Sequence, residues 1–245
     1  MIQIITSRSN ERIKEAVKLK NVSYRNEYGL FLIEGFHLLE MALAKNLVVT
    51  VFTLNEIPNL PEGVEQIVAS PETLKKISSQ VTPQGVVAIC HFLKPKTTLG
   101  NRVLFLDEVA DPGNVGTLIR TALAFDFTSV VLSEKCASVY NDKVISASQG
   151  ALFSINIVKG DGEVLTSLQK EGYQIIATSL KAVTPIDKLQ VAKKLVIILG
   201  NEAHGISATT MALATDQVII PMQHIDSLNV AIAGGIMMYY ATRSK

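Results

Sequence analysis

Three polar segments hold most of the side chains in this sequence that are suited to chemistry. They are Leu106–Ala122, Leu199–Ser207 and Ile220–Ala233. Each follows a short apolar run and leads into a stretch with helical spacing, so each is expected at the carboxyl end of a strand. Open α/β sheets bind ligands at those ends. If the three strands are neighbours, the loops build one site from Asn114, Arg120, Asn201, Glu202, His204, Ser227 and Asn229.

Arg120 is the least expected of these residues because it lies in an otherwise apolar helical stretch. An arginine among such neighbours extends to water or meets an anion. Two interpretations stay open at this point. Arg120 forms a structural ion pair with a nearby acid such as Glu202, or it is held at a phosphate or beside a reacting hydroxyl.

The other polar residues have ordinary structural interpretations beside the functional ones. Asn114 follows Pro-Gly and is suited to cap the helix that starts there, and Ser227 is suited to cap the last helix, with Asn229 in its first turn. Gly200 and Gly205 fit places where the chain turns sharply or lets a ligand approach its backbone. None of the loops has the GxGxxG or GxxxxGK[ST] pattern, so the dinucleotide and phosphate-loop fingerprints do not apply.

The elements that position these loops alternate between strand and helix. The apolar runs after residue 101 are rich in β-branched residues and apolar on both faces, which predicts a buried parallel sheet with helices on both sides. We expect strands at 102–107, 129–133, 153–158, 173–178, 195–200 and 216–221, and helices at 114–125, 142–149, 162–171, 207–213 and 227–242.

A smaller α/β unit is expected before these elements. Its predicted strands are 29–34, 48–54 and 85–92, and its predicted helices are 9–20 with Ser9 as cap, 35–46, and one opened by Ser70 and Pro71. The stretch 93–101 has proline, lysine and glycine without a hydrophobic period, as linkers do. We therefore expect one domain over 1–97 and a second over 98–245.

Composition sets outer limits on the function. The chain has 245 residues and a net charge of +1, so its overall charge does not indicate a polyanion partner. The bases nonetheless gather near the start, where Arg8, Arg12, Lys14 and Lys18 form a local basic patch. The two cysteines form no metal-ligand spacing with the four histidines, so no metal is expected. No apolar run is long enough for a membrane span, and we expect a cytoplasmic protein.

The three loops together resemble the motifs of a known family. Asn114 with Arg120 six residues later, the run from Gly200 to Gly205 with Glu202 inside it, and Ser227-Leu-Asn229 follow one another as in the SpoU (TrmH) family of RNA ribose 2′-O-methyltransferases, in the SPOUT superfamily. The resemblance covers about residues 102–243. Residues 1–95 resemble the substrate-binding domain that often precedes this catalytic domain. Here His37 stands where a basic residue, often arginine, is expected, and Ala231 where a serine is common.

The resemblance implies a knotted catalytic domain that forms a homodimer. It also implies that S-adenosyl-L-methionine binds in the knot, with Gly200, Asn201, Gly205, Ile220 and Leu228 as cofactor-binding residues. The substrate would be structured RNA, with ribosomal RNA favoured over transfer RNA.

The implied reaction moves a methyl group to a ribose 2′-hydroxyl. Catalytic roles then fall to Arg120 at the hydroxyl, Asn114 at the nucleotide, Glu202 as support for Arg120 or for the Asn114 loop, and Ser227 and Asn229 in the floor of the site. Two alternatives remain: a catalytically silent RNA-binding protein on the same scaffold, and a nucleotide-binding enzyme of another type.

Overall fold

The computed structural model describes residues 3–243, which form two compact units. One unit runs to Lys94 and also takes in Tyr140–Ser146. The other consists of Pro95–Val139 and the chain from Ala147 onward. The short return of the chain to the first unit is not visible in the sequence pattern.

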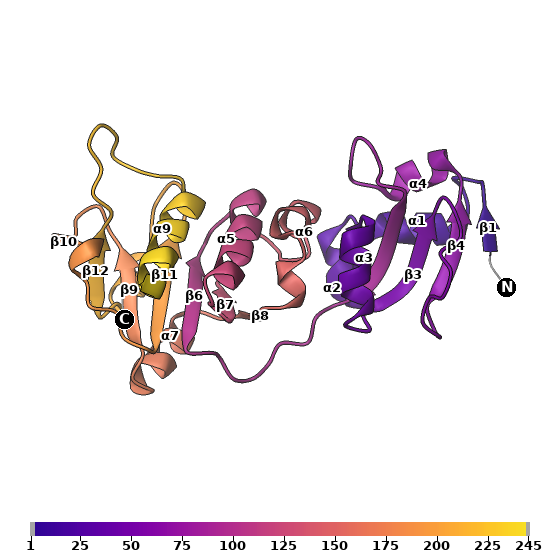
Figure 1. Cartoon of the computed structure of the whole chain (residues 1–245). Helices are drawn as coiled ribbons and strands as arrows, with labels where there is room; N and C mark the ends of the chain where they lie inside the picture. Colours follow the sequence, from indigo (N-terminus) through magenta and orange to yellow (C-terminus); the bar gives the residue numbers. More distant parts are fainter. Residues whose placement is uncertain (1–2, 244–245) are drawn as a thin grey trace. The chain divides into compact units, whose positions relative to one another are not determined.

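The second unit is built on a seven-stranded sheet in which all the pairings are parallel. The strand order is β10-β12-β9-β11-β6-β7-β8 (Figure 1). The strands are β6 (Arg102–Asp107), β7 (Ser129–Leu132), β8 (Asn156–Lys159), β9 (Gln174–Thr178), β10 (Thr184–Pro185), β11 (Leu195–Gly200) and β12 (Asp216–Ile219). The helices along this part of the chain are α5 (Pro112–Ala124), α6 (Asp142–Ser148), α7 (Gly162–Lys170), α8 (Ala208–Met211) and α9 (Val230–Arg243), with short 3₁₀ turns at Ala151–Phe153 and Ile186–Lys188.

Helices cover both faces of this sheet, as the apolar strands predict. Alternate strand residues such as Phe105 and Ile198 pack with Leu165 and Leu168 of α7. Leu199 has the opposite parity and lies against Gly234 of α9, which also lies close to Leu118 of α5. Because successive strand side chains point to opposite faces, α7 covers one face and the α5–α9 pair the other. The predicted parallel α/β fold is confirmed.

The strands that carry the three loops are not all neighbours. β6 and β11 pair directly over six residues, from Leu195 opposite Arg102 to Gly200 opposite Asp107. β12 is separated from β11 by β9. The condition that the three strands be neighbours is therefore met by β6 and β11 but not by β12. The loop between β12 and α9 instead runs back toward the ends of β6 and β11.

The first unit has a five-stranded mixed sheet in the order β1-β4-β3-β5-β2. Its strands are β1 (Gln3–Ile5), β2 (Leu30–Glu34), β3 (Val48–Thr53), β4 (Glu65–Ala69) and β5 (Val86–His91), and its helices are α1 (Glu11–Lys18), α2 (Val22–Tyr28), α3 (Phe36–Leu43) and α4 (Pro71–Ile77). The small α/β unit is thus confirmed. Asn10 rather than Ser9 caps α1, because the Asn10 side chain accepts a hydrogen bond from the Arg12 amide. The sequence pattern did not predict α2, β1 or β4.

Two basic side chains of this unit, the buried Arg25 and the exposed Lys20, bind carbonyls at helix ends. The buried Arg25 donates from Nη1 to the carbonyls of Leu19 and Lys20, each at 3.0 Å, just beyond the end of α1. Lys20 donates to the carbonyls of Lys76 and Ser78 at the end of α4. Cations at helix carboxyl ends satisfy free carbonyls and the helix dipole. These bases therefore have structural partners within the unit.

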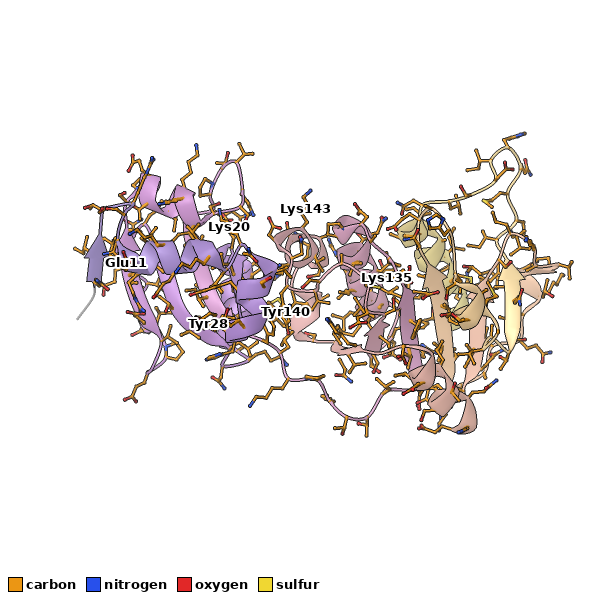
Figure 2. The ribbon with its side chains drawn as sticks, turned by 180° about the vertical axis from the view of Figure 1, so that it is seen from behind. Glu11, Lys20, Tyr28, Lys135, Tyr140 and Lys143 are labelled. Carbon is orange, nitrogen blue, oxygen red and sulfur yellow. The ribbon has the colours of Figure 1, made fainter. Side chains whose placement is uncertain are left out.

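An aromatic cluster holds the segment Tyr140–Ser146 to the first unit. The Tyr140 ring stacks on Phe92 with centroids 3.8 Å apart and lies 4.7 Å from the ring of Phe31. Its hydroxyl accepts a hydrogen bond from the Leu93 amide at 2.9 Å. Figure 2 labels Tyr140 among the side chains of the chain. Across residues 3–243, no helix is both long enough and apolar enough to span a bilayer.

Candidate functional site

Glu202 binds the first loop of the site directly. Its carboxylate follows β11 and accepts hydrogen bonds from the backbone amides of Ala110 and Asp111, at 3.2 and 3.1 Å. It also accepts one from Nδ2 of Asn114 at 3.0 Å. Because β6 and β11 are neighbours, their loops leave the sheet side by side. Glu202 was expected to support either Arg120 or the Asn114 loop, and these hydrogen bonds join it to the Asn114 loop.

Asn229 brings the third loop into the same cluster. Its Oδ1 accepts from the amides of Ala231 and Ile232 at 2.9 and 3.3 Å, which makes Asn229 the cap of α9. Its Nδ2 is then free to donate to Oδ1 of Asn114 at 3.0 Å. Since Asn114 accepts there, its own Nδ2 must face Glu202. The cap of α9 thus fixes the orientation of the Asn114 amide.

Two capping predictions are wrong. Asp111, not Asn114, caps α5, because its carboxylate accepts from the Asn114 amide at 2.8 Å and helical backbone already begins at Pro112. Asn229, not Ser227, caps the last helix, and it precedes the first turn instead of lying in it. Ser227 is exposed in the loop before it. The side chains of Asn114 and Asn229 form hydrogen bonds that join the loops to one another.

The loop after β11 folds back on itself as a tight hairpin. Asn201 and Gly205 exchange two backbone hydrogen bonds, at 3.0 and 2.9 Å. The Asn201 side chain donates to the Glu108 carbonyl at 2.8 Å and accepts from the amides of Ala203 and His204. The side chain of Asn201 therefore serves the architecture of the loops, and its backbone N–H is used within the hairpin, so its backbone offers a ligand only the second lone pair of the carbonyl.

Gly200 is required by this hairpin. A Cβ atom at Gly200 would overlap the backbone of Gly205 and Ile206, which cannot move aside as a flexible side chain would. Gly205 has φ of +72°, in the left-handed region that glycine adopts without strain. The glycines thus allow two backbone segments to touch directly beyond the end of β11.

The hydrogen bonds at Glu202 affect its acidity. Burial is the largest single effect and raises the pKa, but the bonds from Asn114 and from the backbone amides together outweigh it, so the Glu202 pKa lies below its ordinary value. The carboxylate stays charged at neutral pH. Its role is to hold the loop amides by charge-assisted hydrogen bonds, which are stronger than neutral ones.

Arg120 is exposed on α5, and no ion pair joins it to Glu202 or to any other acid in the part of the chain that the structure describes. The structural interpretation of Arg120 as the ion-pair partner of Glu202 is therefore not supported. The guanidinium is left available for a ligand. It lies six residues beyond Asn114 on the same helix.

The predicted cofactor residues lie in the hairpin and near the two ends of the third loop. Gly200 is buried at the end of β11, and Ile220 and Leu228 are half-buried near the two ends of the third loop. Backbone groups and apolar side chains of this kind fit an adenine ring and a neutral amino-acid chain better than a phosphate. The residues present therefore fit S-adenosyl-L-methionine. No group of three or more candidate metal ligands occurs among the described residues.

Sequence reasoning missed several residues around the site. Asp107 is buried at the end of β6 and accepts from the Ser207 amide at 2.7 Å, which ties the first loop to the second. Glu108 adopts φ of +59° and pairs with Lys135 at 2.7 Å. Asp111 before Pro112 is a helix-start signature that was available in the sequence.

The basic patch near the start of the chain is a candidate RNA-binding surface, because the family that the sequence resembles acts on RNA. Its four bases differ in whether other side chains already engage them. Arg12 forms an ion pair with Glu65, and Lys14 forms one with Glu11 at 2.6 Å. Lys18 lies over the ring of Tyr24, 5.6 Å from its centroid, and Arg8 makes no ion pair within the described residues. Two of the four bases are therefore already partly neutralised.

Fold and site together define an α/β protein with a candidate ligand site at the carboxyl ends of parallel strands, in three loops joined by Glu202, Asn114 and Asn229. The chain belongs to the SpoU rRNA methylase family, whose model matches residues 101–239. The MRM3-like substrate binding domain matches residues 10–88.

Similar proteins match over nearly the whole chain. The 23S rRNA (guanosine(2553)-2′-O)-methyltransferase RlmP of Bacillus subtilis is 31% identical, covering 96% of this chain and 98% of that protein. A putative RNA methyltransferase of the TrmH family from Porphyromonas gingivalis has a TM-score of 0.87 at 30% identity, covering 97% and 99% of the two chains. The AdoMet-bound rRNA methyltransferase from Sinorhizobium meliloti has a TM-score of 0.89 at 27% identity, covering 99% and 98%.

Proposed function

We propose that this protein transfers a methyl group from S-adenosyl-L-methionine to a ribose 2′-hydroxyl of structured RNA, with ribosomal RNA favoured over transfer RNA. Membership of the SpoU family carries this proposal. The names of the similar proteins, among them a 23S rRNA 2′-O-methyltransferase and an AdoMet-bound rRNA methyltransferase, support the substrate and the cofactor. We also propose a cytoplasmic location for this activity.

The chain's own residues would mainly orient the reactants. Bound S-adenosyl-L-methionine supplies an electrophilic methyl group, and the protein aligns it with the attacking oxygen. Guanidinium groups do not act as proton acceptors in proteins, so we assign Arg120 to orienting the 2′-hydroxyl and stabilising the negative charge that develops there, not to removing the proton.

Asn114 is proposed to position the nucleotide. Its Nδ2 has one proton left after the bond to Glu202, and its Oδ1 has one lone pair left after accepting from Asn229. Because the orientation of the amide is fixed, the directions of its remaining N–H and lone pair are fixed as well. Glu202 and Asn229 act through Asn114, and Ser227 contributes to the floor of the site.

The cofactor is proposed to bind at the hairpin beyond β11, with Gly200, Asn201 and Gly205 contributing backbone groups. Ile220 and Leu228 would supply apolar walls for the adenine ring. The missing side chain at Gly200 lets the backbone of Gly205 and Ile206 pack against it, which gives the hairpin its shape.

A homodimer is proposed to form through the second unit. The α5–α9 pair exposes Leu123, Ile232 and Tyr239, and the Tyr239 ring packs against Phe125 with centroids 5.9 Å apart. Apolar side chains grouped on paired helices are typical of surfaces that associate. Sedimentation of the Leu123→Glu, Ile232→Glu double variant tests this surface, because a variant that sediments like the wild type would exclude it.

Labelled methyl transfer tests the function as a whole. The full chain is incubated with methyl-tritiated S-adenosyl-L-methionine and with total ribosomal or transfer RNA from a strain lacking the gene. Ribosomal RNA should acquire label that resists alkali as a 2′-O-methylated dinucleotide. RNA binding without any transfer would instead favour the catalytically silent protein on this scaffold.

A further inference from the structure

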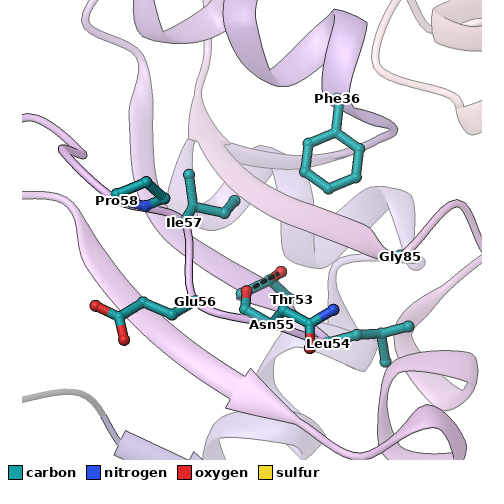
Figure 3. Close-up of a pocket in the computed structure, with 8 residues that line it drawn as sticks. All are labelled: Phe36, Thr53, Leu54, Asn55, Glu56, Ile57, Pro58 and Gly85. Atoms are coloured by element: carbon teal, nitrogen blue, oxygen red, sulfur yellow. Dashed lines mark hydrogen bonds between the residues drawn. The ribbon is translucent and has the colours of Figure 1, made fainter.

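The first unit contains a hollow that none of the assigned functions uses. Its volume is about 320 Å³, and it is lined by Phe36, Thr53, Leu54, Asn55, Glu56, Ile57, Pro58 and Gly85. The lining comes from the start of α3, the loop after β3 and the turn before β5 (Figure 3). β5 runs antiparallel to β2 and β3, so the segments that follow β2 and β3 and the turn that precedes β5 lie at the same end of the strands.

The wall of the hollow is apolar and its polar groups are mostly satisfied. Thr53 Oγ1 donates to the Asn55 carbonyl at 2.7 Å, and the Leu54 amide donates to the Gly85 carbonyl. A Cβ at Gly85 would lie 3.8 Å from the Phe36 ring and 3.9 Å from a Leu54 methyl, so glycine keeps this side open. In Figure 3 the Phe36 ring faces the hollow from one side and Ile57 and Pro58 stand across from it.

Two large apolar side chains at the hollow are exposed to solvent. Phe36 is 55% exposed and Leu54 is 37% exposed, although both are large and apolar. The side chains of Asn55 and Glu56 are exposed beside them and make no hydrogen bond within the described residues. An open aromatic face with unused polar groups at its rim is suited to a flat heterocycle that stacks and hydrogen-bonds at its edge.

We propose that this hollow holds one unstacked base of the RNA, which stacks on Phe36 and offers its edge to Asn55. The proposal rests on the proposed function, because RNA is the substrate there. The substrate-binding domain model covers every residue of the hollow, at residues 10–88. Single-stranded bases splayed out of a helix are the features that proteins read in RNA, and aromatic side chains are their usual platforms.

Base stacking can be measured without methyl transfer. Full-length protein is titrated with a uridine decamer that carries one 2-aminopurine, whose fluorescence falls when it stacks. The wild type should quench the probe, and Phe36→Tyr should bind it equally well. Phe36→Ala should bind about 5- to 100-fold more weakly, the loss typical of a single base–aromatic contact. Because Phe36 is mostly exposed, the alanine variant should remain folded, which circular dichroism checks.

Tyr28→Ala is the matched control, since Tyr28 is an aromatic residue of the same unit that is 52% exposed on α2, away from the hollow. It should bind as the wild type does. The proposal is overturned if Phe36→Ala quenches like the wild type, or if Tyr28→Ala loses as much affinity. An apolar protein segment would be the occupant in the first case. Tritium transfer by the same samples separates the two ideas, because a wild type that quenches the probe but methylates no RNA contradicts only the proposed function.

Discussion

Arg120 offers the sharpest division of roles at the residue scale. It is exposed and without an acidic partner on α5, whereas the proposed cofactor residues lie in the loops after β11 and β12. Arg120→Ala should therefore lower methyl transfer by roughly 100-fold or more, the usual cost of losing one transition-state donor. S-adenosyl-L-methionine affinity, measured by calorimetry, should not change. Arg120→Lys keeps the charge but not the planar fork and should recover little activity. Parallel losses of cofactor affinity and turnover would contradict this assignment.

Glu202 links the site to acid stability. Its pKa is lower in the folded chain than in the unfolded one, so it stabilises the fold above its unfolded value near pH 4.3, and that contribution disappears as the pH falls through the lower folded value. Glu202→Gln turns one acceptor into a donor facing backbone amides. We expect a melting temperature about 2 to 4 °C lower at pH 7. The difference from the wild type should shrink below about pH 4. A difference that is constant with pH would argue against an ionised Glu202.

Residue types were easier to predict than their partners. The sequence identified Asn114, Glu202 and Asn229 as site residues because polar side chains directly after buried strands are conspicuous. It could not show that Asn229 caps α9 and thereby orients Asn114, since that contact joins residues 115 positions apart. Asp107 was overlooked because a single acid at a strand end has no distinguishing pattern.

At the scale of elements, the hairpin after β11 depends on glycine for two different reasons. Gly200→Ala would place a Cβ onto the backbone of Gly205 and Ile206, so it should disrupt the hairpin and abolish cofactor binding. Gly205→Ala meets no atom within 4 Å but must keep φ of +72°, at a cost of about 1 to 2 kcal/mol. Calorimetry with S-adenosyl-L-methionine should therefore detect binding by the second variant only. Equal affinities would show that the hairpin adjusts to a side chain at Gly200.

The contribution of α1 to RNA binding should follow the ion pairs of the structure. Arg8 and Lys18 form no ion pair within the described residues, although each lies near an acid, whereas Arg12 and Lys14 do form ion pairs. The Arg8→Gln, Lys18→Gln variant should lower the log–log salt slope of RNA affinity by roughly 1.4 to 1.8, or about 0.7 to 0.9 per phosphate. The matched Arg12→Gln, Lys14→Gln variant should lower it by less. If both slopes stay at the wild-type value, the RNA does not lie along α1.

Elements with a strong local pattern were predicted well, and those defined by long-range pairing were not. The strands β6 and β11 were placed to the residue because each is a continuous apolar run. β1 and β4 are short strands that pair with each other across more than 60 positions, and β4 contains Glu65 and Gln66. Their strand conformation depends on those partners. The position of β12, with β9 between it and β11, likewise depends on topology that no local pattern contains.

At the scale of the whole molecule, the domain boundary near residue 97 remains a prediction with one complication. The chain returns to the first unit at Tyr140–Ser146, where Tyr140 stacks on Phe92 and packs near Phe31.

A fragment of residues 98–245 therefore lacks the partners of that segment and exposes the Tyr140 ring. We expect this fragment to bind S-adenosyl-L-methionine but to aggregate more readily than the full chain, and Tyr140→Ser within the fragment should improve its solubility. In the full chain the same substitution should destabilise the fold by about 1 to 3 kcal/mol, less than the loss of a fully buried aromatic ring, because Tyr140 is half-buried. Light scattering of the two fragments and urea unfolding of the two full chains measure these effects. A fragment that stays monodisperse with Tyr140 in place would mean that Tyr140–Ser146 folds back onto the second unit when the first is absent.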